Sequence, residues 1–205
     1  MIKPIPPIVI LAAGNSSRLG QPKQFLKWGN TTLLEHTVNQ ALHSESTDIW
    51  VVTGAYHSEM TDLLADYPVQ ILHNSDWKNG LGSSIATATK ELALLHSSIL
   101  FLLADQPEVT TAYINRMITE FRTGENNIVA TQYPNSIGIP VVFDKTYFSE
   151  LAINSGNGAK QVLLSHAKQV SVIEPAQAFQ DIDTKEDYEK LYLEYWGESA
   201  PLFKR

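Results

Sequence analysis

The 205-residue sequence contains no cysteine, which excludes disulfide bonds, thiolate metal sites and cysteine nucleophiles. It is also short of positive charge, since 15 lysines and arginines face 22 aspartates and glutamates, for a net charge of −7. This balance argues against a nucleic-acid partner. We therefore expect any anionic ligand to be held by local cations, backbone amides or a metal ion.

Long hydrophobic runs are absent as well. The longest runs, at residues 8–13 and 99–104, fall far short of the roughly 20 residues that a membrane-spanning helix needs. The apolar stretch near the N-terminus is short and follows three prolines, which is not typical of a signal peptide. We therefore expect a cytoplasmic protein with no membrane contact.

The pattern of short apolar runs and amphipathic stretches predicts the fold. Strands are expected at 8–12, 48–54, 69–73, 98–104, 128–133, 139–143 and 169–173, and helices at 32–42, 58–67, 82–95, 110–121, 145–153, 158–166 and from about 184. This alternation predicts an α/β fold, a Rossmann-like three-layer αβα sandwich around a mostly parallel sheet. At about 150 residues per domain, the length favours one domain over residues 1–205.

Two details refine this prediction. Thr32 with Glu35, and Thr184 with the aspartate three residues later, have the spacing of a capping box at a helix start. Pro140 in the strand at 139–143 favours an edge strand or a bend. Ligands of such sheets bind beyond the carboxyl ends of the strands, so the loops after 8–12 and 98–104 are the places to search.

The loop after the first strand is suited to a polyphosphate. Gly14 and Ser16 belong to a run of small residues whose backbone N–H groups can approach an anion closely. Arg18 can donate two hydrogen bonds to phosphate oxygens, and Lys23 supplies a second positive charge. The loop matches neither the P-loop pattern nor G-x-G-x-x-G. The alternative interpretation is an ordinary polar loop with two exposed cations.

Carboxylates occupy two further positions of interest. Asp105 follows the very apolar strand at 98–104, where a charge needs a partner because burial without one is costly. It could be a Mg²⁺ ligand, since Mg²⁺ prefers one or two carboxylates with phosphate oxygens and water, or it could serve a turn or helix start. Asp181 and Asp183 share one side of an extended segment, where one could complete the site or assist the cap at Thr184.

Two other segments could contact a nucleotide base or ribose. Gly54 and Ala55 end the second strand and leave room for a planar base. The sequence "NGLGSS" at 79–84 opens a helix, whose free N–H groups and serine hydroxyls could bind base or ribose edges. A plain helix cap is the alternative interpretation of this second segment.

Several of these stretches carry a resemblance to a known family. The sequence "LAAGNSSRLGQPK" at 11–23 resembles the L-A-A-G-x-S-x-R-M-G-x-x-K signature of nucleotidyltransferases related to molybdenum cofactor synthesis. Further stretches follow in the order typical of the molybdenum cofactor cytidylyltransferase subgroup: TLLEHTVNQAL, VVTGAY, NSDWKNGLGSSIATA, LLADQPEVT, IPVVFDKTYFSEL, SGNGAKQVL and DIDTKEDYEKL. The resemblance covers residues 8–192.

The resemblance implies a Mg²⁺-dependent enzyme that transfers a nucleotide from an NTP, and the sequence "GQPK" favours CTP. It implies catalytic roles for Arg18, Lys23 and Asp105, with Mg²⁺ on Asp105 and, as we expect, on Asp183 rather than Asp181. The nucleotide contacts that we expect are Leu11, Ala12, Ala13, Gly14, Ser16, Arg18, Lys23, Gly54, Ala55, Asn79, Gly80, Gly82, Ser83 and Ser84.

The second substrate is less defined, because the chain departs from the family where the acceptor should bind. Ile139 stands where a histidine is common, and Asn157 where an aspartate is common. We expect molybdopterin as the acceptor, contacted by Gln106, Pro107 and Asp181, and a molybdoenzyme as a possible partner. The alternatives are the same chemistry on a sugar phosphate or a methylerythritol-type phosphate, or a non-catalytic module that binds a nucleotide or cofactor for delivery to a molybdoenzyme.

Overall fold

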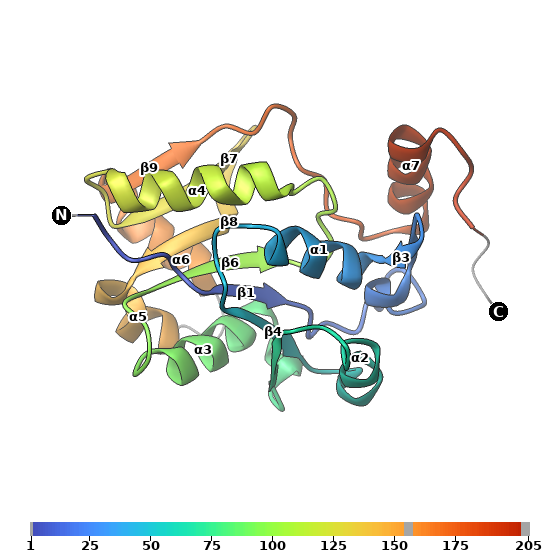
Figure 1. Cartoon of the computed structure of the whole chain (residues 1–205), viewed down its shortest axis with the longest axis horizontal. Helices are drawn as coiled ribbons and strands as arrows, with labels where there is room; N and C mark the ends of the chain where they lie inside the picture. Colours follow the sequence, from blue (N-terminus) through green and yellow to red (C-terminus); the bar gives the residue numbers. More distant parts are fainter. Residues whose placement is uncertain (1, 154–157, 202–205) are drawn as a thin grey trace.

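The computed structural model describes residues 2–153 and 158–201, and its centre is a seven-stranded sheet (Figure 1). The strand order is β5-β4-β1-β6-β8-β7-β9. The strands are β1 (Ile8–Leu11), β4 (Ile49–Thr53), β5 (Gln70–His73), β6 (Ser98–Leu103), β7 (Ile128–Tyr133), β8 (Ser136–Asp144) and β9 (Val170–Ile173). Only β8 pairs antiparallel with its neighbours in this sheet. The expected mostly parallel sheet is therefore confirmed.

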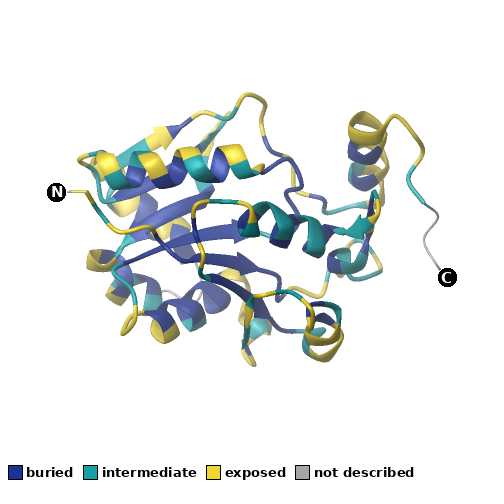
Figure 2. Cartoon of the chain, in the orientation of Figure 1, coloured by how far each residue is buried: buried dark blue, intermediate teal, exposed yellow. Residues whose placement is uncertain are grey.

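Helices cover both faces of the sheet, which confirms the three-layer sandwich. Alternate residues of β1 point to opposite faces, so that Ile8 and Ile10 pack with one hydrophobic cluster while Val9 and Leu11 pack with another. The first cluster contains residues of α1 (Leu33–Leu42), α2 (His57–Leu63) and α4 (Thr111–Thr123), and the second those of α3 (Leu81–Leu92), α5 (Phe148–Ile153) and α6 (Gly158–Ser165). Figure 2 shows the sheet and the inner faces of these helices as the buried part of the molecule.

Pro140 does not mark an edge strand, because β8 lies between β6 and β7. The bend is present instead. Ala130 of β7 is opposite Val141, whereas Thr131 is opposite Gly138, so the two intervening residues of β8 bulge out of the ladder with β7. The missing N–H of Pro140 therefore interrupts no regular pairing with β7.

The C-terminal helix α7 (Lys185–Trp196) lies beyond one end of the sheet, against a small hairpin that the sequence did not reveal. The hairpin is formed by β2 (Lys27–Trp28) and β3 (Thr31–Thr32). Trp28 is buried and packs edge-on against Tyr192 of α7, with ring centroids 5.6 Å apart. Gly29 is needed at the turn, where φ is +62° and a Cβ atom would lie 2.6 Å from the ring of Trp196.

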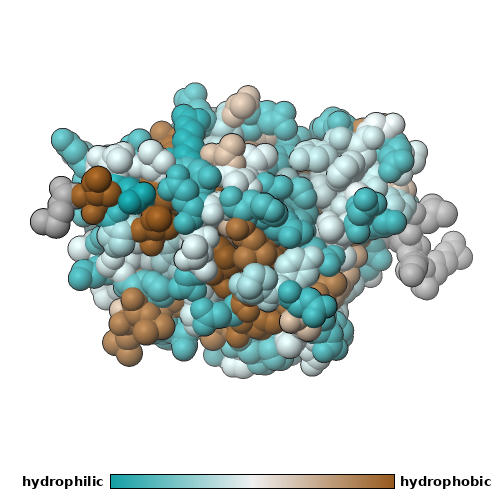
Figure 3. Space-filling model, viewed as in Figure 1, coloured by the Kyte–Doolittle hydropathy of each residue, from teal (hydrophilic) through white to brown (hydrophobic). Residues whose placement is uncertain are grey.

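None of the helices in the described ranges is long and apolar enough to cross a membrane. On the face shown in Figure 3, hydrophobic side chains form separate patches among hydrophilic ones.

Both expected capping boxes are present. The Thr32 hydroxyl accepts the N–H of Glu35, and the Thr184 hydroxyl accepts the N–H of Asp187 at 3.1 Å, while each acidic side chain accepts the N–H of its threonine. The hydrogen bond from the Thr184 side chain, followed by those from backbone N–H groups, lowers the pKa of Asp187. The carboxylate form is therefore favoured in the folded state.

We expect Thr184→Ala to lower the free energy of unfolding by about 1 kcal/mol, because the cap of α7 is lost. Because the folded-state pKa of Asp187 lies below its unfolded value of about 3.9, its contribution is complete above that pH and is lost as the pH falls through the folded-state pKa. Urea unfolding at pH 7 and at pH 3 measures both effects. Thr119→Ala, at an exposed position within α4, is the control, and an equal loss in the two variants would contradict the prediction.

Candidate active site

The candidate site forms where the carboxyl ends of β1 and β6 lie side by side. These strands are paired and parallel, so the loop after β1 and Asp105 after β6 emerge at the same edge of the sheet. A third segment, residues 174–184 between β9 and α7, crosses this edge, and we call it the acidic strap. The N–H of Ile182 in the acidic strap donates to the carbonyl of Asp105 at 3.1 Å.

Two cations and two carboxylates meet at this crossing. The Lys23 ammonium donates to Asp105 and lies 3.2 Å from Oδ1 of Asp183. Arg18 Nη2 lies 2.8 Å from the other carboxylate oxygen of Asp183. The Arg18 side chain is 73% exposed, whereas those of Lys23 and Asp105 are largely buried. The structure thus brings together all three residues predicted to be catalytic and the aspartate preferred as second metal ligand.

Burial and charge shape the protonation of this cluster. Burial raises the pKa of Asp105, Lys23 opposes this rise, and Asp181 adds to it. Burial alone would lower the pKa of Lys23, but the carboxylates of Asp105 and Asp183 outweigh it and hold the pKa above its ordinary value. Lys23 is therefore positively charged at neutral pH, and its charge compensates the carboxylate of Asp105, which has little contact with solvent.

The loop after β1 is the segment that we predicted to bind a polyphosphate. It is held in shape by a residue that we did not single out from the sequence. Gln24, which is 1% exposed, donates from Nε2 to the carbonyls of Ala12 at 2.7 Å and Gly14 at 2.8 Å. Ser16 has a φ of +54°, and its hydroxyl accepts the N–H of Lys23 at 3.0 Å. These bonds fix the backbone between the two cations. In the sequence, only its position directly after the predicted lysine could have drawn attention to Gln24, because its burial appears only in the fold.

A first cavity of about 340 Å³, here called the nucleotide cavity, opens at this cluster. Its walls combine the loop after β1, both cations, three aspartates and the start of α3. The lining residues are Leu11, Ala12, Ala13, Gly14, Arg18, Lys23, Gln24, Trp77, Gly80, Leu81, Ser84, Leu103, Ala104, Asp105, Asp181 and Asp183. Of the expected nucleotide contacts, the loop residues other than Ser16, together with Gly80 and Ser84, line this cavity.

Other expected nucleotide contacts do not line this cavity. A Cβ atom on Gly54 would lie 2.6 Å from the carbonyl of Ala13, so close packing against the end of β1 accounts for this glycine. Ser83 is buried, donates to the carbonyl of Gly80 at 2.8 Å and accepts from Asn74. Ala55 and Asn79 also lie off the cavity, Gly82 lines an adjoining cavity, and Ser16 lines a small hollow beside Arg18. Nucleotide contacts by these residues stay predictions.

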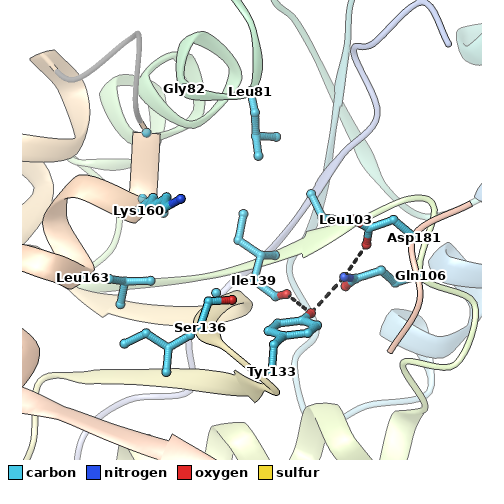
Figure 4. A pocket seen from close by; sticks show the side chains of 14 residues that line it. Leu81, Gly82, Leu103, Gln106, Tyr133, Ser136, Ile139, Lys160, Leu163 and Asp181 are labelled. Atoms are coloured by element: carbon cyan, nitrogen blue, oxygen red, sulfur yellow. Dashed lines mark hydrogen bonds between the residues drawn. The ribbon is translucent and has the colours of Figure 1, made fainter. Parts of the chain in front are cut away.

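A second cavity of about 330 Å³, here called the acceptor cavity, adjoins the first and shares Leu81, Leu103 and Asp181 with it. Figure 4 shows its lining: aliphatic side chains from several elements, Lys160 at one side and Asp181 at the other. Gln106 donates from Nε2 to Asp181 and to the hydroxyl of Tyr133, at 2.8 Å each. Burial raises the pKa of Tyr133, so its hydroxyl stays protonated and donates to the carbonyl of Ile139.

Two of the three expected acceptor contacts line the acceptor cavity. Gln106 and Asp181 line the acceptor cavity, whereas Pro107 lines neither cavity and accepts a hydrogen bond from Nε2 of His36 at 2.9 Å. Ile139 lines the acceptor cavity, and Asn157 lies outside the described residues. The sequence analysis did not single out Tyr133, and it quoted Lys160 only within the SGNGAK stretch.

The four charged residues Arg18, Lys23, Asp105 and Asp183, here called the ion cluster, lead to a prediction about stability. We expect Lys23→Met to lower the free energy of unfolding by about 3 kcal/mol, because it leaves the buried Asp105 carboxylate without its cation. Arg18→Met should cost at most about 1 kcal/mol, since that ion pair is exposed. The double variant Lys23→Met with Asp105→Asn should be more stable than Lys23→Met alone. Denaturant unfolding of the wild type, Lys23→Met, Asp105→Asn and the double variant measures this cycle, and strictly additive effects would rule out the coupling.

Comparison with known proteins agrees with this geometry. Residues 8–170 match the MobA-like NTP transferase domain family. The molybdenum cofactor cytidylyltransferase of Escherichia coli (strain K12) is 32% identical over 184 residues, which cover 88% of this chain and 92% of that protein. The nicotine blue oxidoreductase of Paenarthrobacter nicotinovorans is 28% identical over 89% of this chain and 94% of that protein.

Solved structures agree as well. The crystal structure of Rv0371c from Mycobacterium tuberculosis H37Rv is similar with a TM-score of 0.78 and 29% identity, covering 94% of this chain and 99% of that one. Its complex with manganese has a TM-score of 0.74 and 27% identity, covering 92% and 98%. The chain therefore belongs to the MobA-like NTP transferase domain family and is a nucleotidyltransferase with a cytidylyltransferase among its relatives.

Proposed function

We propose that the protein transfers the cytidylyl group of CTP to the phosphate of molybdopterin and releases pyrophosphate. The observation that carries this proposal is the placement of the ion cluster. Arg18, Lys23, Asp105 and Asp183 line the nucleotide cavity, and Asp181 lies where that cavity meets the acceptor cavity. Two substrates bound in these cavities would meet beside these charges.

The reaction makes few demands on acid–base chemistry. An acceptor phosphate oxygen attacks the α-phosphorus of the NTP, and the bond to the pyrophosphate oxygen breaks. Because the attacking oxygen is already anionic, no strong general base is needed, and catalysis consists of positioning and charge neutralisation. Lys23 and Arg18 are the cations that line the nucleotide cavity, and we propose that they stabilise the negative charge that develops on pyrophosphate.

The carboxylates fit a divalent cation. Asp105 and Asp183 come from different segments yet both reach the Lys23 ammonium, so their oxygens can converge on one cation. The donors that Asp105 and Asp183 offer are carboxylate oxygens, which Mg²⁺ prefers. We propose that these two aspartates hold Mg²⁺, which would act as a Lewis acid toward phosphate oxygens. The manganese complex of Rv0371c supports divalent-metal binding in this fold.

The lining of the acceptor cavity favours an acceptor with a ring system over a simple sugar phosphate. Leu81, Leu103, Ile137, Ile139 and Leu163 supply aliphatic walls, which suit the face of a planar heterocycle better than a ring of hydroxyl groups. The name of the Escherichia coli relative supports CTP and the molybdenum cofactor. Sugar and methylerythritol-type phosphates remain the alternative acceptors, and a carrier without turnover the alternative role.

We expect pyrophosphate release from CTP with Mg²⁺ and molybdopterin, and less from GTP or ATP. Asp105→Ala should abolish release because the proposed metal ligand is lost. A coupled pyrophosphate assay with the three nucleotides measures both effects. A panel with a sugar phosphate and methylerythritol phosphate in place of molybdopterin tests the acceptor. Binding of CTP without pyrophosphate from any combination would contradict the enzyme and support the carrier.

We expect Lys23→Ala to lower kcat/KM for CTP at least about tenfold, equivalent to about 1.4 kcal/mol of transition-state stabilisation. The physical reason is the loss of the buried cation that lines the nucleotide cavity. Steady-state kinetics on protein shown to be folded by circular dichroism measures the effect. Lys90→Ala, on the exposed side of α3, is the control, and wild-type turnover in Lys23→Ala would remove Lys23 from the mechanism.

A further inference from the structure

The acidic strap has no helix or strand of its own, so its position depends on individual contacts. Two buried side chains anchor it to the hydrophobic clusters. Phe179 packs edge-on against Tyr113 of α4, with centroids 4.8 Å apart, and Ile182 joins the cluster around Trp28. Asp181 and Asp183 flank Ile182 and lie at the cavities. These apolar contacts hold the acidic strap against the protein, but its backbone N–H groups need hydrogen-bond acceptors from elsewhere.

Glu108, in the loop between β6 and α4, supplies such partners. It is 7% exposed, and Oε2 accepts the backbone N–H of Gln180 at 2.8 Å. Oε1 accepts from Nε2 of Gln177, also at 2.8 Å. Across residues 2–153 and 158–201, Glu108 forms no ion pair. A buried carboxylate without an ion-paired cation is costly, and these two hydrogen bonds, together with the weaker attraction of Lys190, compensate its burial.

The loop that holds Glu108 is also the loop that holds Asp105. Within four residues it contacts the acidic strap at three places: Asp105 through its carbonyl to Ile182, Gln106 through its amide to Asp181, and Glu108 through its carboxylate. The first two contacts involve residues that line the cavities. Glu108 lies away from both cavities and has no contact of its own with the ion cluster.

We propose that Glu108 is a positioning residue that fixes the acidic strap so that Asp181 and Asp183 face Asp105. Its catalytic consequence rests on the proposed function, whereas its effect on the strap does not. Without Glu108, the strap keeps its apolar anchors but loses two hydrogen bonds directly before Asp181. The second carboxylate of the metal site is then less well placed, while the loop after β1 and the rest of the nucleotide cavity are unchanged.

Glu108→Ala tests this proposal by three readouts. Hydrogen exchange followed by NMR should show the Gln180 amide exchanging at least about tenfold faster, because its acceptor is lost. Mn²⁺, added alone and followed by electron paramagnetic resonance, should bind at least about fivefold more weakly. The Mg²⁺ concentration for half-maximal pyrophosphate release should rise, while KM for CTP stays within about twofold.

Two matched variants complete the design. Glu108→Gln keeps a side-chain oxygen for the Gln180 N–H and should restore exchange and Mn²⁺ affinity close to wild type. Glu194 is a carboxylate that lines the same hollow as Glu108 and approaches Lys190 only at 4.0 Å, and Glu194→Gln should change neither readout. If Glu108→Ala does not fold, Gln177→Ala removes one of the two bonds at an exposed position and should move both readouts in the same direction.

The outcomes separate this inference from the proposed function. Unchanged exchange and unchanged Mn²⁺ affinity in the folded variant would overturn the positioning role. A Glu108→Gln protein as impaired as Glu108→Ala would overturn it too, because it would show that the negative charge acts and not the contact. A wild-type protein without pyrophosphate release would refute the proposed function alone, since exchange and Mn²⁺ affinity would still report on the strap.

Discussion

The contact of Lys23 with Asp105 and Asp183 is the interaction on which the candidate site depends. Asp105 ends one of the most buried strands, and a carboxylate there is tolerable only beside a cation. Lys23 can serve because the loop after β1 leaves the sheet next to β6. Asp183 then reaches the same ammonium from the acidic strap. One largely buried ammonium group thus ties three distant segments of the chain together at one edge of the sheet.

The distribution of charge on either side of this cluster divides the site into two compartments. All the cations and carboxylates of the cluster line the nucleotide cavity, whereas the acceptor cavity is mainly aliphatic, with Lys160 and Asp181 as its charged residues. Leu81 and Leu103 form the apolar part of the shared wall. Under the proposed function, the charged part of the substrates would lie in one compartment and the ring system in the other, and the two would meet at the wall formed by Leu81, Leu103 and Asp181.

The sequence predicted what local patterns determine. The strands, most helices and both capping boxes follow from hydrophobic periodicity and from residues three positions apart. The β2–β3 hairpin could not be predicted, because its two-residue strands are stabilised by Trp28 packing against α7, far along the chain. Gln24 and Tyr133 were missed for the same reason: their roles arise from partners that only the folded sheet brings near. Pro107 and Gly54 contact other protein groups in the folded chain, and their expected ligand contacts stay predictions.

The acidic strap has no helix or strand, so its position depends on contacts with the loop after β6. A helix or strand would satisfy its backbone internally, whereas here the N–H of Ile182 donates to the backbone carbonyl of Asp105 and the N–H of Gln180 donates to the side chain of Glu108. That loop also supplies Gln106, which faces the acceptor cavity and holds Asp181. Gln106 therefore links the lining of the acceptor cavity to Asp181, and Asp181 lies two residues before Asp183, the carboxylate beside Lys23. The acceptor cavity and the ion cluster are therefore joined by one continuous set of contacts.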